Sequence, residues 1–157
     1  MTEAHDDLIG RRRYTAQTAA TISGWKTTAV FTDPSNLKTL NTPVSIANLQ
    51  HQLTVGGPVS VSIDATPPDF YYYGGGVYDN AACTAYDLDH SVLAVGFGVV
   101  AKTPTETQKY WIVKNSWSSY WGEGGYVRVM YSDTQNTCGV ATTPAYVTGL
   151  QLGDDAK

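Results

Sequence analysis

Two polar residues, His90 and Asn115, stand at the edges of apolar runs that are typical of strands. His90 comes directly before "SVLAVGFG", and Asn115 follows "YWIVK" in the next predicted strand. A histidine can take up or release a proton near neutral pH, and an asparagine oxygen can accept a hydrogen bond from an imidazole N–H. If the two strands pair, these side chains lie close together, and the residues alone leave open whether His90 does chemistry or is only a polar residue at the mouth of a strand.

The other two histidines, His5 and His51, are interpreted as structural or exposed residues. Neither belongs to a cluster of cysteine, histidine and carboxylate residues with the spacing of metal ligands, so no metal site is predicted. The two cysteines, Cys83 and Cys138, could form one disulfide or remain buried thiols. Their spacing alone does not choose between these possibilities.

The helix and the first strand of the predicted fold can be read from the hydrophobic pattern. A helix is predicted over about 43–54, where Thr42 can cap and Pro43 can take the first helical position. Glycines at 56 and 57 end it. The alternating run "VSVSI" that follows predicts a strand with one buried face, formed by Val59, Val61 and Ile63.

The second half of the chain is predicted to be mostly antiparallel sheet. Strands are expected at about 91–98, 109–114 and 125–131, with "AKTPTETQ" as a polar hairpin loop between the first two. The segment "PPDFYYYGGGVYD" is interpreted as an irregular surface loop. Residues 1–20 have no sustained apolar period and are expected to be a weakly structured segment.

The composition indicates one globular domain and excludes several kinds of partner. The 157 residues suit a single unit, with 42% hydrophobic and 15% charged residues. A net charge of -4 gives no electrostatic reason to bind nucleic acid or an anionic membrane. No apolar stretch is long enough to span a bilayer. The first residues, "MTEAHDDLIGRRR", do not have the pattern of a signal peptide.

Three segments of the sequence resemble the papain-like cysteine peptidases. "LDHSVLAVGFG" is similar to the family's histidine motif, "KYWIVKNSWSSYWGEGGYVRV" to its asparagine motif, and "NTCGVA" to a segment near its C-terminus. The resemblance covers roughly residues 21–148. It implies an α+β fold for residues 21–157: the mostly antiparallel, barrel-like, β-rich C-terminal lobe of the family with one flanking helix, without the helical lobe that carries the cysteine.

The resemblance also implies roles for individual residues. His90 matches the catalytic acid/base, Asn115 the residue that orients it, and Trp117 and Trp121 the motif's tryptophans, with Trp117 covering the His90–Asn115 hydrogen bond. Cys83 and Cys138 match a half-cystine pair, so the resemblance implies a disulfide. The candidates for the main specificity pocket are Ser62, Leu88, Ser91 and Thr143, and Asp89 would contribute its backbone to substrate binding.

The nucleophile of this chemistry is not found in the sequence. The family signature C-G-[SA]-C-[WY] does not occur, and the glutamine of the oxyanion hole that precedes it in the family is missing as well. The chain alone is therefore expected to be inactive. Two hypotheses remain: a peptidase lobe whose helical lobe is lost or supplied as another chain, and a non-catalytic remnant that acts as a binding or interaction protein.

The expected partners and location follow from the same resemblance. The partners would be a peptide or protein substrate and, under the first hypothesis, a helical cysteine-bearing lobe; no cofactor, nucleic acid or membrane is expected. Family members with this disulfide are found in lysosomes, vacuoles or outside the cell, which suits an oxidising compartment. We also expect the sheet face next to a missing lobe to be exposed and apolar.

Overall fold

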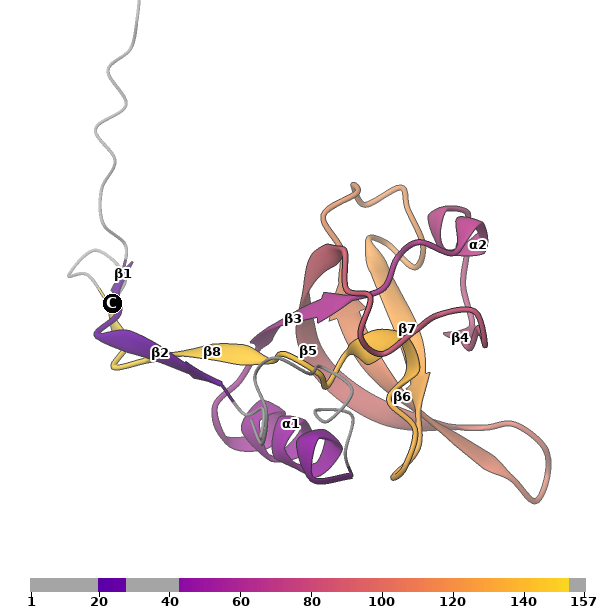
Figure 1. Cartoon of the computed structure of the whole chain (residues 1–157), viewed down its shortest axis with the longest axis horizontal. Helices are drawn as coiled ribbons and strands as arrows, with labels where there is room; N and C mark the ends of the chain where they lie inside the picture. The colour runs from indigo at the N-terminus through magenta and orange to yellow at the C-terminus, as the bar shows by residue number, and fades with distance from the viewer. Residues whose placement is uncertain (1–19, 28–42, 153–157) are drawn as a thin grey trace, which may run out of the picture.

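The computed structural model describes residues 20–27 and 43–152, and these form two sheets and two α-helices (Figure 1). The main sheet has seven strands in the order β2-β8-β3-β5-β6-β7-β4. Their bounds are Gly24–Thr27 (β2), Val59–Ile63 (β3), Val77–Tyr78 (β4), His90–Ala101 (β5), Thr107–Lys114 (β6), Tyr126–Tyr131 (β7) and Ala145–Thr148 (β8). Two short strands, β1 (Ala20–Thr21) and β9 (Gln151–Leu152), pair separately.

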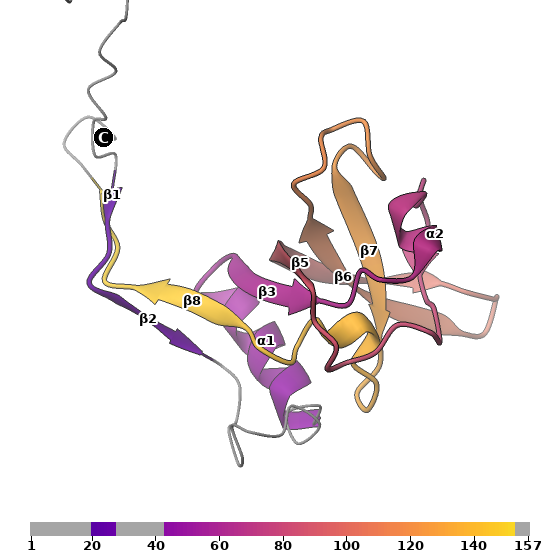
Figure 2. The same cartoon turned by 45° about the horizontal axis from the view of Figure 1, so that its top comes forward.

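The expected β-rich lobe is confirmed in its content and in most of its pairing. All neighbours in the main sheet are antiparallel except β4 and β7, and β2 and β4 are its edge strands. Figure 1 places the β2–β8 ribbon at one end of the molecule and β4 at the other, and Figure 2 shows the same ribbon at the end opposite the helix that precedes β4. The predicted weakly structured segment 1–20 lies outside the described residues except for its last residue.

The predicted helix is confirmed as α1 (Pro43–Val55), which packs against β3 and β5 (Figure 1). Its buried apolar side chains are Ile46 and Leu49, three residues apart on one face of the helix. Gln50 Nε2 donates a hydrogen bond of 2.8 Å to the hydroxyl of Tyr131 in β7. Gly57 then turns the chain toward β3 at φ 86°, in the left-handed region that favours glycine.

The predicted strands are confirmed, and the alternation in β3 has the expected sense. Val59, Val61 and Ile63 are all buried in the core. Strand β5 extends to Ala101, so the hairpin loop to β6 is shorter than the polar run that predicted it. The pairing of β5 with β6 contains a bulge between Ala94 and Gly96, where the register shifts by one residue.

The interpretation of "PPDFYYYGGGVYD" as a surface loop is wrong in part. The segment contains the short helix α2 (Pro68–Tyr71) and the strand β4, and Phe70 is 0% exposed. Tyr73 and Tyr78 are also in the core. The proline at the start of α2 suits a first helical turn, and burial of three aromatic rings outweighs the lack of periodicity. Tyr71 and Tyr72 remain exposed.

The disulfide expected from the family resemblance is present between Cys83 and Cys138, whose Cα atoms are 4.8 Å apart. Cys138 belongs to η3 (Thr137–Gly139), a single 3-10 turn that precedes β8. The bond joins the loop before His90 to this turn; Cys138 is in the buried core, and Cys83 is partly buried and packs against it.

Within the described part of the chain, we find no helix with the length and apolar character needed to cross a membrane.

Candidate active site

His90 and Asn115 are brought together by the pairing of β5 with β6. His90 is the first residue of β5 and lies opposite Ile63 of β3, while Asn115 directly follows β6. The His90 Nε2 and Asn115 Oδ1 atoms are 2.8 Å apart. Asn115 is only 8% exposed, and its backbone N–H donates to the carbonyl of Gly125 at 2.9 Å. The acceptor is therefore fixed in place before any substrate binds.

The orientation of the Asn115 amide assigns the proton on the imidazole. Its Oδ1 also accepts a hydrogen bond of 2.7 Å from the backbone N–H of Ser116. A backbone N–H is always a donor, so the side-chain atom that faces it must be the oxygen. Nε2 of His90 faces the same oxygen and must therefore carry a hydrogen. In the neutral ring this leaves Nδ1 as the nitrogen that can accept a proton.

Trp117 stacks on the imidazole, and its shielding of the His90–Asn115 bond stays a prediction. The two ring centroids are 4.9 Å apart with an interplanar angle of 29°. Behind it, Phe70 makes edge contacts with Trp117 at 5.7 Å and a tilted contact with Trp121 at 5.3 Å. Trp121 Nε1 donates to the carbonyl of Tyr71 at 2.9 Å, which fastens α2 to this group. We call His90, Trp117, Trp121 and Phe70 the aromatic cluster.

Phe70 is the member of the aromatic cluster that sequence reasoning missed. It lies in a run of aromatic residues without an alternating or helical period, so nothing separates the buried ring from the exposed ones. The nearest signal is the pair of prolines before it, which is typical of the start of a helix and would have placed Phe70 in its first turn.

An ion pair links Glu123, in the segment after Trp121, to Arg128 in β7. Arg128 donates to both carboxylate oxygens of Glu123, from Nε at 2.8 Å and from Nη2 at 2.6 Å. The same carboxylate accepts from the backbone N–H of Gly76 at 3.0 Å, which joins β7 to the loop after α2. The hydrogen bonds from Arg128 lower the pKa of Glu123 below its usual range. The bidentate geometry makes this a directional contact.

Asp89 and Leu88, the two residues before His90, are held by contacts with other segments. The N–H of Asp89 donates to the carbonyl of Ile63 at 3.1 Å, and its carboxylate accepts from the N–H of Ala65 at 2.8 Å. The side chain of Leu88 lies against Gly139, where a β-carbon would collide with it. Glycine at that position therefore lets Leu88 approach the turn that carries Cys138.

The remaining pocket candidates are only partly brought together. Ser62 and Ser91 lie directly opposite each other on β3 and β5, with their side chains on the same face of the sheet. That face continues through Ser60 and Leu93, which line a hollow of about 400 Å³. Thr143 lies just before β8, whose Ala145 lines the same hollow. A role for Ser62, Leu88, Ser91 and Thr143 in specificity stays a prediction.

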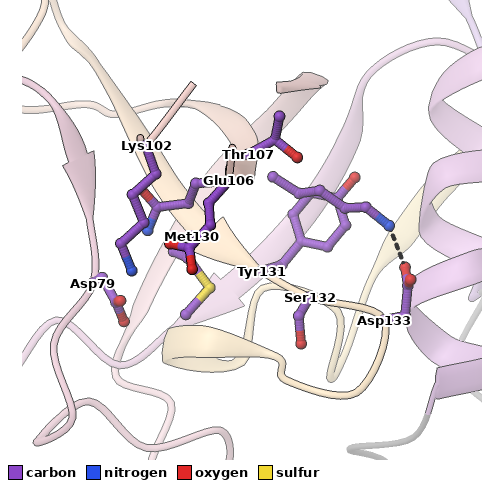
Figure 3. Close-up of a pocket in the computed structure, with 10 residues that line it drawn as sticks. Asp79, Lys102, Glu106, Thr107, Met130, Tyr131, Ser132 and Asp133 are labelled. Atoms are coloured by element: carbon purple, nitrogen blue, oxygen red, sulfur yellow. Dashed lines mark hydrogen bonds and ion pairs between the residues drawn. The ribbon is translucent and has the colours of Figure 1, made fainter. Parts of the chain in front are cut away.

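A second hollow, of about 380 Å³, contains neither His90 nor Asn115 (Figure 3). It lies between the β5–β6 hairpin and the end of β7, and Asp133, labelled in Figure 3, forms an ion pair of 2.6 Å with Lys109. Among the described residues no group of three or more histidine, cysteine or acidic side chains could hold a metal ion. His51 is exposed on α1, and His5 lies outside the described residues.

Neither cysteine of the sequence is a free thiol. The 157 residues contain two cysteines, Cys83 and Cys138, and these form the disulfide. A sulfur atom in a disulfide has no proton to give to His90 and cannot act as a thiolate nucleophile. The residues that the structure brings together are therefore a histidine, an amide that accepts a hydrogen bond from it and an indole stacked on its ring.

The fold and the site define a β-rich lobe with a histidine–asparagine pair, and the comparisons with known proteins place it in a family. The model of the papain family cysteine proteases matches residues 7–148. Digestive cysteine proteinase 3 of Homarus americanus is 45% identical over 100 residues, which are 64% of this chain and 29% of that protein. Procathepsin L of Felis catus is 44% identical over 61% of this chain and 28% of its own length.

Solved structures give the same result. Digestive procathepsin L 3 of Tenebrio molitor superposes with a TM-score of 0.63 at 36% identity, covering 82% of this chain and 36% of that one. Bromelain of Ananas comosus, in complex with the inhibitor E64, gives 0.61 at 30% identity over 81% of this chain and 50% of its own. The chain belongs to the papain family of cysteine proteases. It spans less than a third of the length of these two curated relatives.

Proposed function

We propose that this chain supplies the acid–base half of a peptide-hydrolysing site, with His90 as the general acid and base and Asn115 as the residue that orients it. The 2.8 Å contact between His90 Nε2 and Asn115 Oδ1 carries the proposal, because it leaves Nδ1 as the nitrogen available for proton transfer. The family membership of the chain supports the choice of reaction.

The proposed reaction begins with proton transfer from a cysteine thiol to Nδ1 of His90, which gives a thiolate beside an imidazolium. The thiolate sulfur attacks the peptide carbonyl carbon, and the imidazolium donates its proton to the leaving amine as the C–N bond breaks. Water then attacks the thioester carbon while His90 accepts one of the water protons, and His90 returns this proton to the cysteine sulfur as the C–S bond breaks. Throughout, Asn115 Oδ1 keeps the ring in place.

The thiol of this reaction would come from outside the 157 residues, since both cysteines here are in the disulfide. We propose a helical, cysteine-bearing polypeptide as the partner, either continuous with this chain or separate from it. Its docking surface would be the sheet face through Ser60, Ser62, Ser91 and Leu93, which adjoins His90 along β5. The hollow on that face is lined mainly by apolar groups and includes the exposed ring of Trp25.

The substrate would be a peptide or protein, bound across His90 between the shielding Trp117 and the pocket candidates. The proposed pocket of Ser62, Leu88, Ser91 and Thr143 combines hydroxyl groups with one apolar side chain, so it would accept a side chain of moderate size. The proposed location is a lysosome, a vacuole or the outside of the cell. The disulfide supports this, because such bonds persist in oxidising compartments.

The test is complementation with a purified helical polypeptide that carries the family's cysteine. Mixed with the full chain, it should cleave a fluorogenic peptide, and His90→Ala should lower kcat about a thousandfold or more. His51→Ala is the matched control, because His51 is exposed on α1 and should leave kcat unchanged. Equal activity of the His90→Ala and unsubstituted chains would show that His90 is not the acid and base.

The second candidate function is a binding protein without catalysis. The observation that favours it is the absence of a free thiol from the whole sequence. In that case the chain would bind peptides, or the helical polypeptide, with no cleavage in the mixture. Calorimetry on the mixture separates the two functions, because binding without product supports the binding protein and product supports the peptidase.

A further inference from the structure

A buried carboxylate that takes no part in the proposed chemistry lies just after β3. Asp64 is 1% exposed. Its Oδ1 accepts hydrogen bonds from the N–H and the hydroxyl of Thr66, at 3.0 and 2.5 Å. Its Oδ2 accepts one of 2.7 Å from the N–H of Thr84. A buried charge is retained only where such donors satisfy it, so these three bonds fix the carboxylate.

The residues on either side of Asp64 hold the other end of the segment that leads to His90. Ile63 accepts the N–H of Asp89 through its carbonyl, and Ala65 donates its N–H to the Asp89 carboxylate. Asp64 itself reaches Thr84, five residues earlier in the same segment. The three consecutive residues 63–65 therefore contact both ends of segment 84–89, whose next residue is His90.

Asp64 also bridges the two sides of the disulfide. Its backbone N–H donates to the carbonyl of Cys138 at 3.0 Å, and its carboxylate accepts from Thr84, the residue after Cys83. The segments joined by the disulfide are thus joined a second time, through Asp64 and without a covalent bond. Burial alone would raise the pKa of Asp64, but the hydrogen bonds from Thr66 and Thr84 outweigh this and the pKa is lowered. The carboxylate is therefore charged near neutral pH.

We infer that Asp64 is a positioning residue for His90, and that it holds the segment before His90 in place independently of the Cys83–Cys138 disulfide. A cysteine thiolate is lost on oxidation, whereas a disulfide is broken on reduction. A second, non-covalent bridge would let the imidazole keep its alignment whether or not the disulfide is intact. The inference rests on the proposed function only where it links the alignment of His90 to proton transfer. The alignment itself can be measured without substrate.

The test measures the exchange of the His90 Nε2–H with water, by NMR on the full chain with ¹⁵N-labelled histidine. Asp64→Asn places an amide NH₂ against N–H donors, so one bond to Thr66 or Thr84 is lost. We expect exchange to accelerate about tenfold, the ratio that corresponds to one such bond. Thr66→Ala is the second variant, for use if Asp64→Asn does not fold. It removes only the hydroxyl donor at an exposed residue, and it should accelerate exchange of the His90 Nε2–H about threefold.

Two controls separate positioning from general destabilisation, and all variants are compared at the same interval below their own Tm. Asp87→Asn makes the same charge change at an exposed residue of the same segment, and Ile46→Ala weakens the core at α1. Both should leave the exchange rate within about twofold of the unsubstituted chain. An equal acceleration in Ile46→Ala would overturn the inference, because the effect would then reflect global stability.

The disulfide is tested with the double variant Cys83→Ala/Cys138→Ala. We expect a lower Tm with exchange of the His90 Nε2–H accelerated by less than in Asp64→Asn. If the double variant accelerates exchange as much as Asp64→Asn or more, the disulfide aligns His90 and the inference is wrong. An unchanged rate in Asp64→Asn would also refute it. Neither result bears on peptide cleavage, which is measured separately.

Discussion

Phe70 gives the sharpest test of the fold, because a surface loop and a buried segment predict opposite results for its replacement. The side chain is 0% exposed and has ring contacts with Tyr78 at 5.3 Å, Trp117 at 5.7 Å and Trp121 at 5.3 Å. Phe70→Ala should lower the free energy of unfolding by about 3–5 kcal/mol, from lost burial and the cavity left behind. This is a large fraction of the roughly 5–15 kcal/mol that stabilises a typical domain.

The expected loss can be measured by urea unfolding followed by tryptophan fluorescence. For a chain of this size, about 1 kcal/mol corresponds to roughly 2–4 °C in Tm, so Phe70→Ala should lower Tm by on the order of 6–20 °C. Phe70→Leu keeps most of the apolar volume and should cost less, about 1.5 kcal/mol. Tyr72→Ala is the control, since this neighbouring ring is 80% exposed and its removal should cost no more than about 0.5 kcal/mol.

The order of the three variants tests the reasoning more strictly than any single value. If Phe70→Ala and Tyr72→Ala have the same free energy of unfolding, the segment is a surface loop and α2 does not pack on the aromatic cluster. The fluorescence of the folded state is a second readout, because Trp117 and Trp121 both contact Phe70. A folded-state spectrum unchanged in Phe70→Ala would contradict these contacts.

Three further predictions concern stability. Ser118 has φ 84°, a conformation that costs a non-glycine residue about 1–2 kcal/mol, so Ser118→Gly should raise Tm slightly once the entropy of glycine is subtracted. The pKa values of Asp64 and Glu123 are lowered from 3.8 and 4.5, so the charged carboxylates stabilise the fold fully above about pH 5. This contribution to the free energy of unfolding is lost as pH falls through the lowered pKa values, and urea midpoints measured from pH 6 to 3 would show the loss. Reducing the Cys83–Cys138 disulfide, at a separation of 55 residues, should cost up to about 4 kcal/mol in urea unfolding.

The sequence predicted the elements with a regular period and the site carried by a motif. Strand β3 alternates strictly, and the structure buries Val59, Val61 and Ile63 as expected. His90 begins one run that is typical of a strand, and Asn115 follows the next run. Antiparallel pairing brings the start of the first strand next to the end of the second, so the two residues could be paired from the sequence. These patterns are local. The alternation of one strand specifies its buried face, and one hairpin specifies which residues lie side by side.

What the sequence could not predict depends on contacts between distant segments. The pairing of β4 with β7 is parallel and only two residues long, which no alternation indicates. Asp64 is a charged residue, and its burial follows from donors on Thr66 and Thr84 that no local pattern connects with it. The proton on His90 Nε2 was likewise assigned only by the N–H of Ser116 that shares its acceptor.

The bulge in β5 sets the phase of the whole strand. Before it, Val92 and Ala94 are buried in the core; after it, Phe97, which is 39% exposed, pairs with the buried Trp111. Deleting Val95 would remove this change of register. The two halves of β5 could then no longer both keep their present faces of the sheet. Either Phe97 would turn away from Trp111, or His90 would rotate to the opposite face and lose Asn115. A single extra residue in the middle of the strand thus lets one strand carry both a hairpin and the candidate site.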